Sequence, residues 1–180
     1  MKTTIYFLLT AAFLLTSCEV DVPDVDREAP TFAFRITGDG FDHTFQSEDD
    51  FDSFVLHLRR DYEYDFLFSG GDSGGLKDLR WLWFDSSSRG IEIDVPAEDR
   101  PNGWNVTSGG YVWYIGDRED PRSGSIIAGT FIPRNGYLSG MMDLEFFAQD
   151  FGGQSGDQNY IEEKLKIVIG NHPTEILPVN

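Results

Sequence analysis

The stretch YEYDFLFSGGDSGGLKDLRWLWF, residues 62–84, decides the fold. Large apolar residues take every second position in both of its halves: Tyr62, Tyr64, Phe66 and Phe68 before the glycines, and Leu79, Trp81 and Trp83 after them. A period of two is that of a strand with one buried face. The glycines between the halves permit the dihedral angles of a connecting loop. The stretch therefore predicts two strands joined by an acidic, glycine-rich loop.

The same alternation recurs on both sides of this stretch. Further strands are expected at 31–36, 91–95, 111–115, 126–132, 138–148 and 160–169, with Gly, Pro, Asn and Ser turns between them. Residues 47–60 fit two alternatives, because Ser47 can cap a helix whereas Phe54, Leu56 and Leu58 alternate as in a strand. About seven or eight short strands without a long helix predict an all-β antiparallel sandwich over residues 30–170.

The N-terminal residues have the composition of an export signal. Lys2 precedes the apolar run IYFLLTAAFLL, residues 5–15, which is too short for a comfortable membrane span. LTSC, residues 15–18, resembles the lipobox of bacterial lipoproteins, whose signal is cut before the cysteine. The resemblance implies a signal peptide at 1–17 and a lipidated Cys18, which anchors the protein to a lipid bilayer through diacylglycerol and usually an N-acyl chain. Cys18 is the single cysteine of the chain, so an internal disulfide is excluded.

The net charge of the chain limits the classes of partner that it is expected to bind. The formal net charge is −17, and removal of Lys2 with the signal would make it −18. Nucleic acid is not expected as a partner, because phosphate backbones are bound by basic patches. Residues 18–29 read as an acidic tether, and such stretches resemble the signals that export some lipoproteins to the cell surface; the alternative is a solvated spacer. We therefore expect a lipid-anchored outer-membrane protein, with surface exposure left open.

Three segments resemble bacterial immunoglobulin-like domains. EAPTFAF, residues 28–34, is similar to their first strand, FLFSGGDSGGLKDLRWLWF to their second and third strands, and LEFFAQDFGGQ, residues 144–154, to their penultimate strand and its loop. The resemblance implies an immunoglobulin-like sandwich. The tract 96–125 departs from the pattern and is expected to be an insertion, and residues 171–180 are expected to be a C-terminal extension.

GDSGG also resembles the nucleophile motif of trypsin-like serine proteases, with Ser73 as the nucleophile. A serine nucleophile needs a base and an orienting group, which that family supplies from long segments before the serine. Only residues 18–72 precede Ser73 in the expected mature chain, and Leu76 replaces the family's proline. The three histidines are scattered without metal-ligand spacing. We therefore expect no catalytic residues and no enzyme activity.

Acidic loops suggest a cation site at one end of the sandwich. In an immunoglobulin-like topology the loops after the second and sixth strands lie at the end where the first strand begins. This juxtaposition would bring Asp72, Asp150 and Asp157 near Asp26 and Glu28. Calcium is bound by about six to eight oxygen ligands, and Ala148-x-Asp150-x-Gly152 resembles a calcium-binding segment of cadherins. Calcium is one hypothesis for these residues; the alternative is that they form turns and carry tether charge.

Aromatic residues suggest a second kind of site. Trp104 lies in the expected insertion, and Tyr111 and Trp113 lie on a strand with aromatic residues on both faces. Exposed aromatic rings stack on sugars and on protein partners. The sequence thus favours a non-catalytic protein- or glycan-binding module at Trp104, Tyr111 and Trp113; the alternative is that tryptophans such as Trp113 belong to the core, which leaves Trp104 as the candidate for exposure. The alternative function is a cell-surface hydrolase that acts on glycans.

Overall fold

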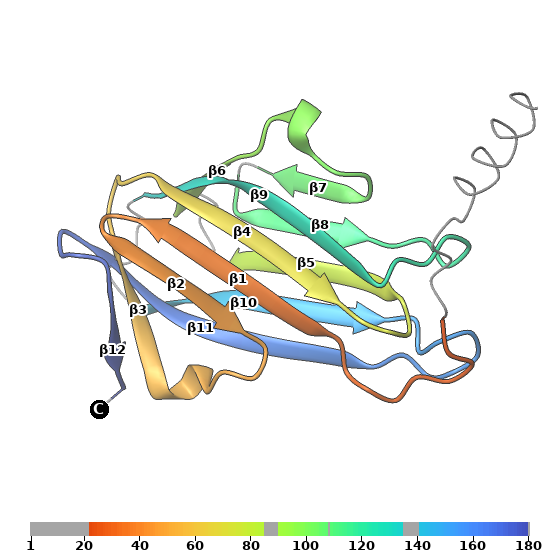
Figure 1. The fold of residues 1–180 in the computed structure, drawn as a ribbon. Helices are drawn as coiled ribbons and strands as arrows, with labels where there is room; N and C mark the ends of the chain where they lie inside the picture. The colour runs from red at the N-terminus through yellow and green to blue at the C-terminus, as the bar shows by residue number, and fades with distance from the viewer. Residues whose placement is uncertain (1–21, 85–89, 108, 135–140, 180) are drawn as a thin grey trace, which may run out of the picture.

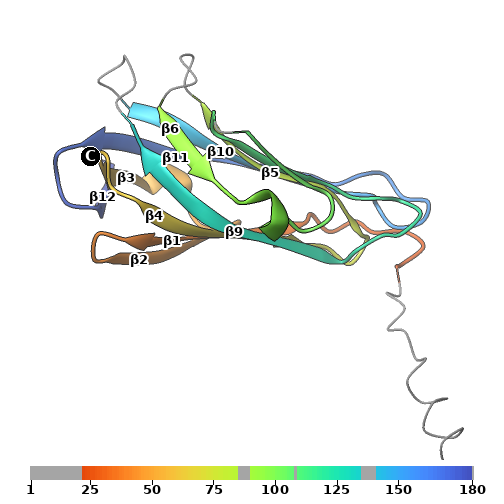
Figure 2. The ribbon, with the colours of Figure 1, turned by 90° about the horizontal axis from the view of Figure 1, so that it is seen from above.

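The computed structural model describes residues 22–84, 90–107, 109–134 and 141–179. These residues form two β-sheets packed face to face, so the predicted all-β sandwich is confirmed (Figures 1 and 2). The described residues contain twelve strands, more than the seven or eight expected. The expected signal peptide and Cys18 lie outside the described residues.

The two sheets differ in size. The smaller has five antiparallel strands in the order β2 (Phe41–Gln46), β1 (Thr31–Gly38), β4 (Tyr64–Gly71), β9 (Gly124–Pro133) and β6 (Ile91–Asp94). The larger has seven strands in the order β12 (Glu175–Pro178), β3 (Phe54–Arg59), β11 (Tyr160–Gly170), β10 (Met141–Asp150), β5 (Leu76–Phe84), β8 (Tyr111–Ile115) and β7 (Trp104–Thr107). The β3–β11 pair is parallel and the other pairs are antiparallel. Short 3-10 turns span Phe51–Ser53 and Ala97–Asp99.

The stretch that decides the fold crosses from one sheet to the other. β4 lies in the five-stranded sheet and β5 in the seven-stranded sheet, so the glycine loop joins the two layers. Phe66 and Trp81 meet between the layers with their ring centroids 5.3 Å apart. Phe34 on β1 packs against Phe146 on β10 at 5.2 Å. The core is therefore a layer of aromatic rings contributed by both sheets.

Three tracts carry more strand than the sequence indicated. Residues 47–60 form a 3-10 turn followed by β3, because Leu56 and Leu58 face the core while β11 and β12 pair with the two edges of the strand. The tract 96–125 contains β7 and β8, which continue the seven-stranded sheet beyond β5. The expected extension 171–180 contains β12, which pairs with β3.

The N-terminal segment lies against the domain over residues 22–28. The backbone N–H groups of Gln154 and Ser155 donate to the carbonyls of Pro23 and Asp24, and Asp26 N–H donates to the carbonyl of Gly152. Gly74 makes room for this contact, since a Cβ there would lie 2.6 Å from Asp26 Oδ2. These residues are therefore packed on the sandwich, in a segment that the sequence presented as a tether. Among the described residues, no helix combines the length and the apolar character needed to cross a bilayer.

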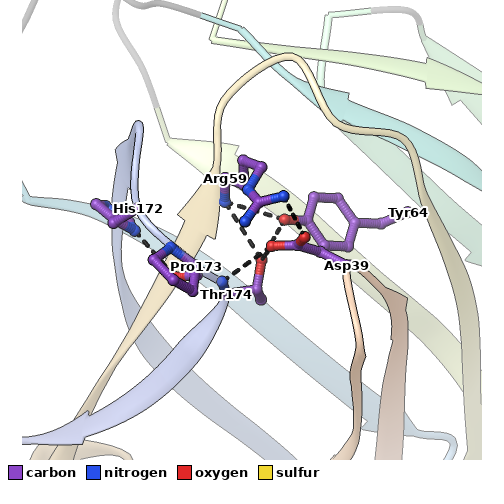
Figure 3. Close-up of polar contacts among 6 residues, drawn as sticks. All are labelled: Asp39, Arg59, Tyr64, His172, Pro173 and Thr174. Carbon is purple, nitrogen blue, oxygen red and sulfur yellow. Dashed lines mark hydrogen bonds and ion pairs between the residues drawn. The ribbon is translucent and has the colours of Figure 1, made fainter.

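The two described termini lie at opposite ends of the sandwich (Figures 1 and 2). At the C-terminal end, a polar network surrounds the fully buried Tyr64 (Figure 3). Its hydroxyl accepts from the Arg59 N–H at 2.9 Å and makes a short hydrogen bond with the Thr174 hydroxyl. The Asp39 carboxylate accepts from the N–H and hydroxyl of Thr174 and pairs with Arg59 at 2.6 Å. The network joins both sheets to the residue that precedes β12.

Candidate functional site

The outer face of the seven-stranded sheet carries the aromatic residues that are turned away from the core. On β8 the pleat directs Val112 and Tyr114 inward, where both are buried, and leaves Tyr111 and Trp113 on the outer face. Phe147 on β10 and Tyr160 at the start of β11 share this face. Tyr160 is 63% exposed. The two faces of β8 are therefore both aromatic, one in the core and one at the surface.

These side chains form two stacks. In the first stack, the rings of Tyr111 and Trp113 are nearly parallel, with centroids 4.4 Å apart. In the second stack, Phe147 lies between Tyr160, at 6.0 Å between ring centroids, and the guanidinium of Arg80, whose Cζ is 4.2 Å from the Phe147 centroid. Arg80 is directly opposite both Phe147 and Trp113 in the strand register. The two stacks are therefore neighbours on the same face.

A shallow hollow of about 190 Å³ lies where the two stacks meet. We call it the sheet hollow; its outer-face residues are Arg80, Leu82, Tyr111, Glu145, Phe147 and Glu162. They fall in two adjacent rows across β11, β10, β5 and β8. The strand register aligns Glu145, Leu82 and Tyr111 in one row and Glu162, Phe147 and Arg80 in the other. The hollow thus combines apolar and aromatic surface with a few charged groups, which is the usual composition of a small-ligand site.

Each charged side chain of the sheet hollow has an opposite charge beside it. Lys164 Nζ lies 2.7 Å from Glu145 Oε1 and 3.6 Å from Glu162 Oε1. The Arg80 guanidinium lies 3.4 Å from Asp78 Oδ2. The hydrogen bond that Lys164 donates to Glu145 raises the pKa of Lys164, so its ammonium stays charged. The charges fix the carboxylates and the guanidinium in place as hydrogen-bonding groups.

Trp104, expected at the surface, belongs to the core. Its side chain is 6% exposed, and its Nε1–H donates to Ser125 Oγ at 2.7 Å. Its ring packs against Phe68 and Tyr114 at 6.1 and 5.6 Å between centroids. The bond to Ser125 connects β7 of one sheet with β9 of the other. Trp104 is therefore a core residue, and the expectation that it helps to form a binding surface was wrong.

Three aspartates meet at the end where the N-terminal segment packs. Asp26, Asp72 and Asp150 each place a carboxylate oxygen within 4.8 Å of the others, and we call them the aspartate cluster. Asp72 follows β4 and Asp150 ends β10, as the predicted loop positions required. Asp157 is exposed and lies outside this cluster.

Each member of the aspartate cluster also shapes its own turn. The Oδ1 atoms of Asp26, Asp72 and Asp150 accept from the backbone N–H two residues ahead, at Glu28, Gly74 and Gly152. Such contacts are typical of aspartates that form turns. The fully buried Asp150 also accepts from the N–H and the side-chain amide of Asn159. Turn formation therefore accounts for much of the hydrogen bonding of the cluster.

The pKa values of Asp72 and Asp26 are shifted in opposite directions within the cluster. Burial, together with the charges of Asp150 and Asp26, raises the pKa of Asp72 to about 6, against the hydrogen bond from Gly74. The hydrogen bond from the Glu28 N–H, followed by those from Ser73 and Asp72, lowers the pKa of Asp26 despite its burial. Asp72 therefore ionises at a higher pH than Asp26.

We expect Asp72→Asn to stabilise the protein at pH 8 by about 1 to 2 kcal/mol and to have little effect near pH 4. The pKa of Asp72 is raised on folding, so protonation of Asp72 stabilises the folded state. This stabilisation is complete below the pKa of the unfolded state and is lost as pH rises through the folded-state pKa of about 6. Partial exposure of Asp72 reduces the effect below the full pKa difference. Chemical unfolding at pH 4, 6 and 8 measures it. The matched control is Asp117→Asn, whose exposed carboxylate makes the same turn contact to Glu119; an equal pH profile in both variants would contradict the prediction.

Calcium binding by the cluster stays a prediction. It requires that millimolar calcium raise the melting temperature of the wild type and leave that of Asp72→Asn unchanged, because a bound ion stabilises the folded state. Thermal unfolding with and without calcium measures this. Equal melting temperatures of the wild type under both conditions would remove calcium from the account.

Two histidines that are far apart in sequence meet at the C-terminal end. The rings of His57 on β3 and His172 before β12 lie 4.7 Å apart between centroids. Burial, and then the charge of His172, lowers the pKa of His57. No spacing rule could have found this pair, because it depends on β12 returning to β3. Sequence reasoning also missed Arg80, Phe147 and Tyr160, which only the strand register brings onto the same face of the sheet as Trp113.

Comparison with known proteins adds little to this description. No family model matches the chain, and no curated protein matches its sequence. Among solved structures, the chain is similar to AggA, the major subunit of aggregative adherence fimbriae type I from Escherichia coli, at 9% identity and a TM-score of 0.35. That match covers 81% of this chain and 99% of the fimbrial subunit.

Proposed function

We propose that the protein is a non-catalytic binding module whose binding surface is the outer face of the seven-stranded sheet. The observation that carries the proposal is the pair of aromatic stacks that meet at the sheet hollow. Tyr160 is exposed and the other three aromatic residues of the stacks are half-buried, and aromatic surface of this kind marks interaction sites. The ligand on this surface is a glycan or a protein.

The module is placed on the outer membrane by acylation of Cys18. The packing of residues 22–28 on the domain supports a short attachment, because only three residues separate Cys18 from Val22 and an extended chain spans at most about 3.6 Å per residue. The aromatic face lies on the flank of the sandwich, between its two ends, so a ligand can reach it beside an anchored end. Protease treatment of intact cells distinguishes a surface location, in which the domain is cleaved, from a periplasmic one, in which it is protected.

A glycan hydrolase is the alternative function. Glu145 and Glu162 both line the sheet hollow, but both are paired with Lys164, at 2.7 and 3.6 Å, so neither is a free carboxylate beside the hollow. Binding without turnover is therefore expected. Release of new reducing ends from any bound glycan would favour the hydrolase.

Replacement of Trp113 by alanine is expected to weaken ligand binding about tenfold or more, because truncation of a central aromatic contact removes much of the binding energy at such surfaces. Glycan arrays and protein pull-downs with the purified protein measure the effect. Leu67→Ala is the matched control, since Leu67 is a 38% exposed apolar residue on the five-stranded sheet. Equal loss in both variants, or no loss in Trp113→Ala, would contradict the proposal.

A further inference from the structure

We propose that the sheet hollow takes a neutral sugar unit of a glycan; this inference rests on the proposed binding function and names its ligand class. The hollow draws its residues from four adjacent strands, β11, β10, β5 and β8, so its shape is fixed by the sheet. Sites on rigid elements hold their polar groups in position more accurately than sites on loops.

Charge selects a neutral ligand. Lys164 lies beside both Glu145 and Glu162, and Asp78 lies beside Arg80, so the charged groups around the hollow already have partners. An anionic sugar would add negative charge to a chain of net charge −17. A cationic peptide would have to compete with Lys164 for the two glutamates. A neutral ligand incurs neither penalty.

The surface of the hollow matches the two kinds of surface on a sugar. Leu82 forms its apolar floor beside the rings of Tyr111 and Phe147, which suits the C–H faces and edges of a sugar ring. The guanidinium of Arg80 donates hydrogen bonds and the carboxylate of Glu162 accepts them, which suits hydroxyl groups that do both. Both residues belong to strands of the seven-stranded sheet, so their backbone positions are set before a ligand arrives, and such preorganisation lowers the cost of binding.

Size favours a sugar unit over a protein surface. The hollow has a volume of about 190 Å³ and is lined by seven residues, whereas a stable protein interface involves roughly 20 to 30 residues on each partner. The guanidinium of Arg80 and the ring of Tyr160 already lie against the ring of Phe147, at 4.2 and 6.0 Å from its centroid. The ligand therefore meets ring edges and the hollow between the stacks, where a small polar unit fits. A protein ligand becomes an outcome of the test.

The test compares neutral and acidic glycans on one array, with the wild type, Phe147→Ala, Glu162→Gln and the control Leu67→Ala. We expect neutral glycans to bind, with affinity lowered about tenfold or more by Phe147→Ala and lowered also by Glu162→Gln, while Leu67→Ala binds like the wild type. Circular dichroism and melting curves identify any variant that fails to fold, and Trp113→Ala then replaces Phe147→Ala.

The outcomes separate this inference from the function on which it rests. Preference for acidic glycans, or capture of a protein alone, with loss in Phe147→Ala, overturns the neutral-sugar inference and leaves the binding face intact. Binding of neutral glycans that neither Phe147→Ala nor Trp113→Ala reduces overturns both. Absence of any glycan binding by the wild type also overturns the neutral-sugar inference.

Discussion

Replacement of Asp39 by alanine is expected to lower the free energy of unfolding by about 3 kcal/mol. The Asp39 side chain is 7% exposed, and its carboxylate accepts two hydrogen bonds from Thr174 and pairs with Arg59. Removal leaves the nearly buried N–H and hydroxyl of Thr174 without this acceptor, at a cost of about 1 to 3 kcal/mol. The backbone φ of Asp39 is 54°, a left-handed value that costs alanine about 1 kcal/mol. Urea unfolding at pH 7 measures the total.

Asp61→Ala separates the network from the backbone. Asp61 also has a left-handed φ of 56° and also pairs with an arginine, at 3.1 Å from Arg134, but its side chain is 60% exposed. The backbone cost is therefore shared, while an exposed ion pair contributes little. We expect a loss of about 1 kcal/mol for Asp61→Ala. Equal losses in the two variants would show that the buried network contributes nothing beyond the turn.

Replacement of Asp150 by alanine is expected to lower the free energy of unfolding by about 2 to 3 kcal/mol. Its fully buried carboxylate accepts from the backbone N–H groups of Gly152 and Asn159 and from the Asn159 amide. Loss of these acceptors leaves buried donors unsatisfied, and relief of repulsion with Asp72 offsets part of the cost. Because Gly152 accepts from the Asp26 N–H, the packing of the N-terminal segment should weaken as well. Hydrogen exchange at residues 24–28 should then rise.

Asp117→Ala is the control for Asp150→Ala. Asp117 makes the same turn contact, to the Glu119 N–H at 2.9 Å, in an exposed loop. Water can replace its carboxylate there, so we expect a change within about 0.5 kcal/mol. A loss as large as that of Asp150→Ala would mean that the turn contact alone, and not its burial, sets the cost.

The architecture could be predicted because alternation is a local property. Tyr111–Ile115 was predicted with the bounds that the structure has, since all five of its residues favour strands. β2 was missed because it buries only Phe45 and four of its six residues are polar, and β7 was missed because its four residues follow a long loop. A strand with one buried residue, or with very few residues, carries too weak a period to detect.

Prediction of the candidate sites is limited in the same way, because they depend on contacts between residues that are far apart in the sequence. Asp72 and Asp150 could be placed at one end of the sandwich, because a sandwich topology alone fixes which loops share an end. Trp104 could not be assigned, since its burial depends on a bond across the sheets to Ser125. The second aromatic stack depends on the register that sets Arg80 opposite Phe147. Register follows from pairing between distant strands and cannot be read from one strand.

Hydroxyl-radical footprinting of the aromatic side chains, with and without the glycan or protein that the binding screens identify, tests the central claim most directly. The account predicts that ligand lowers the labelling of Tyr111, Trp113, Phe147 and Tyr160, on the outer face of the seven-stranded sheet. Tyr62 is the internal reference, because it is 37% exposed and lies at the turn before β4. Protection of Tyr62 with unchanged labelling of Trp113 and Tyr160 would place the ligand elsewhere and contradict the account.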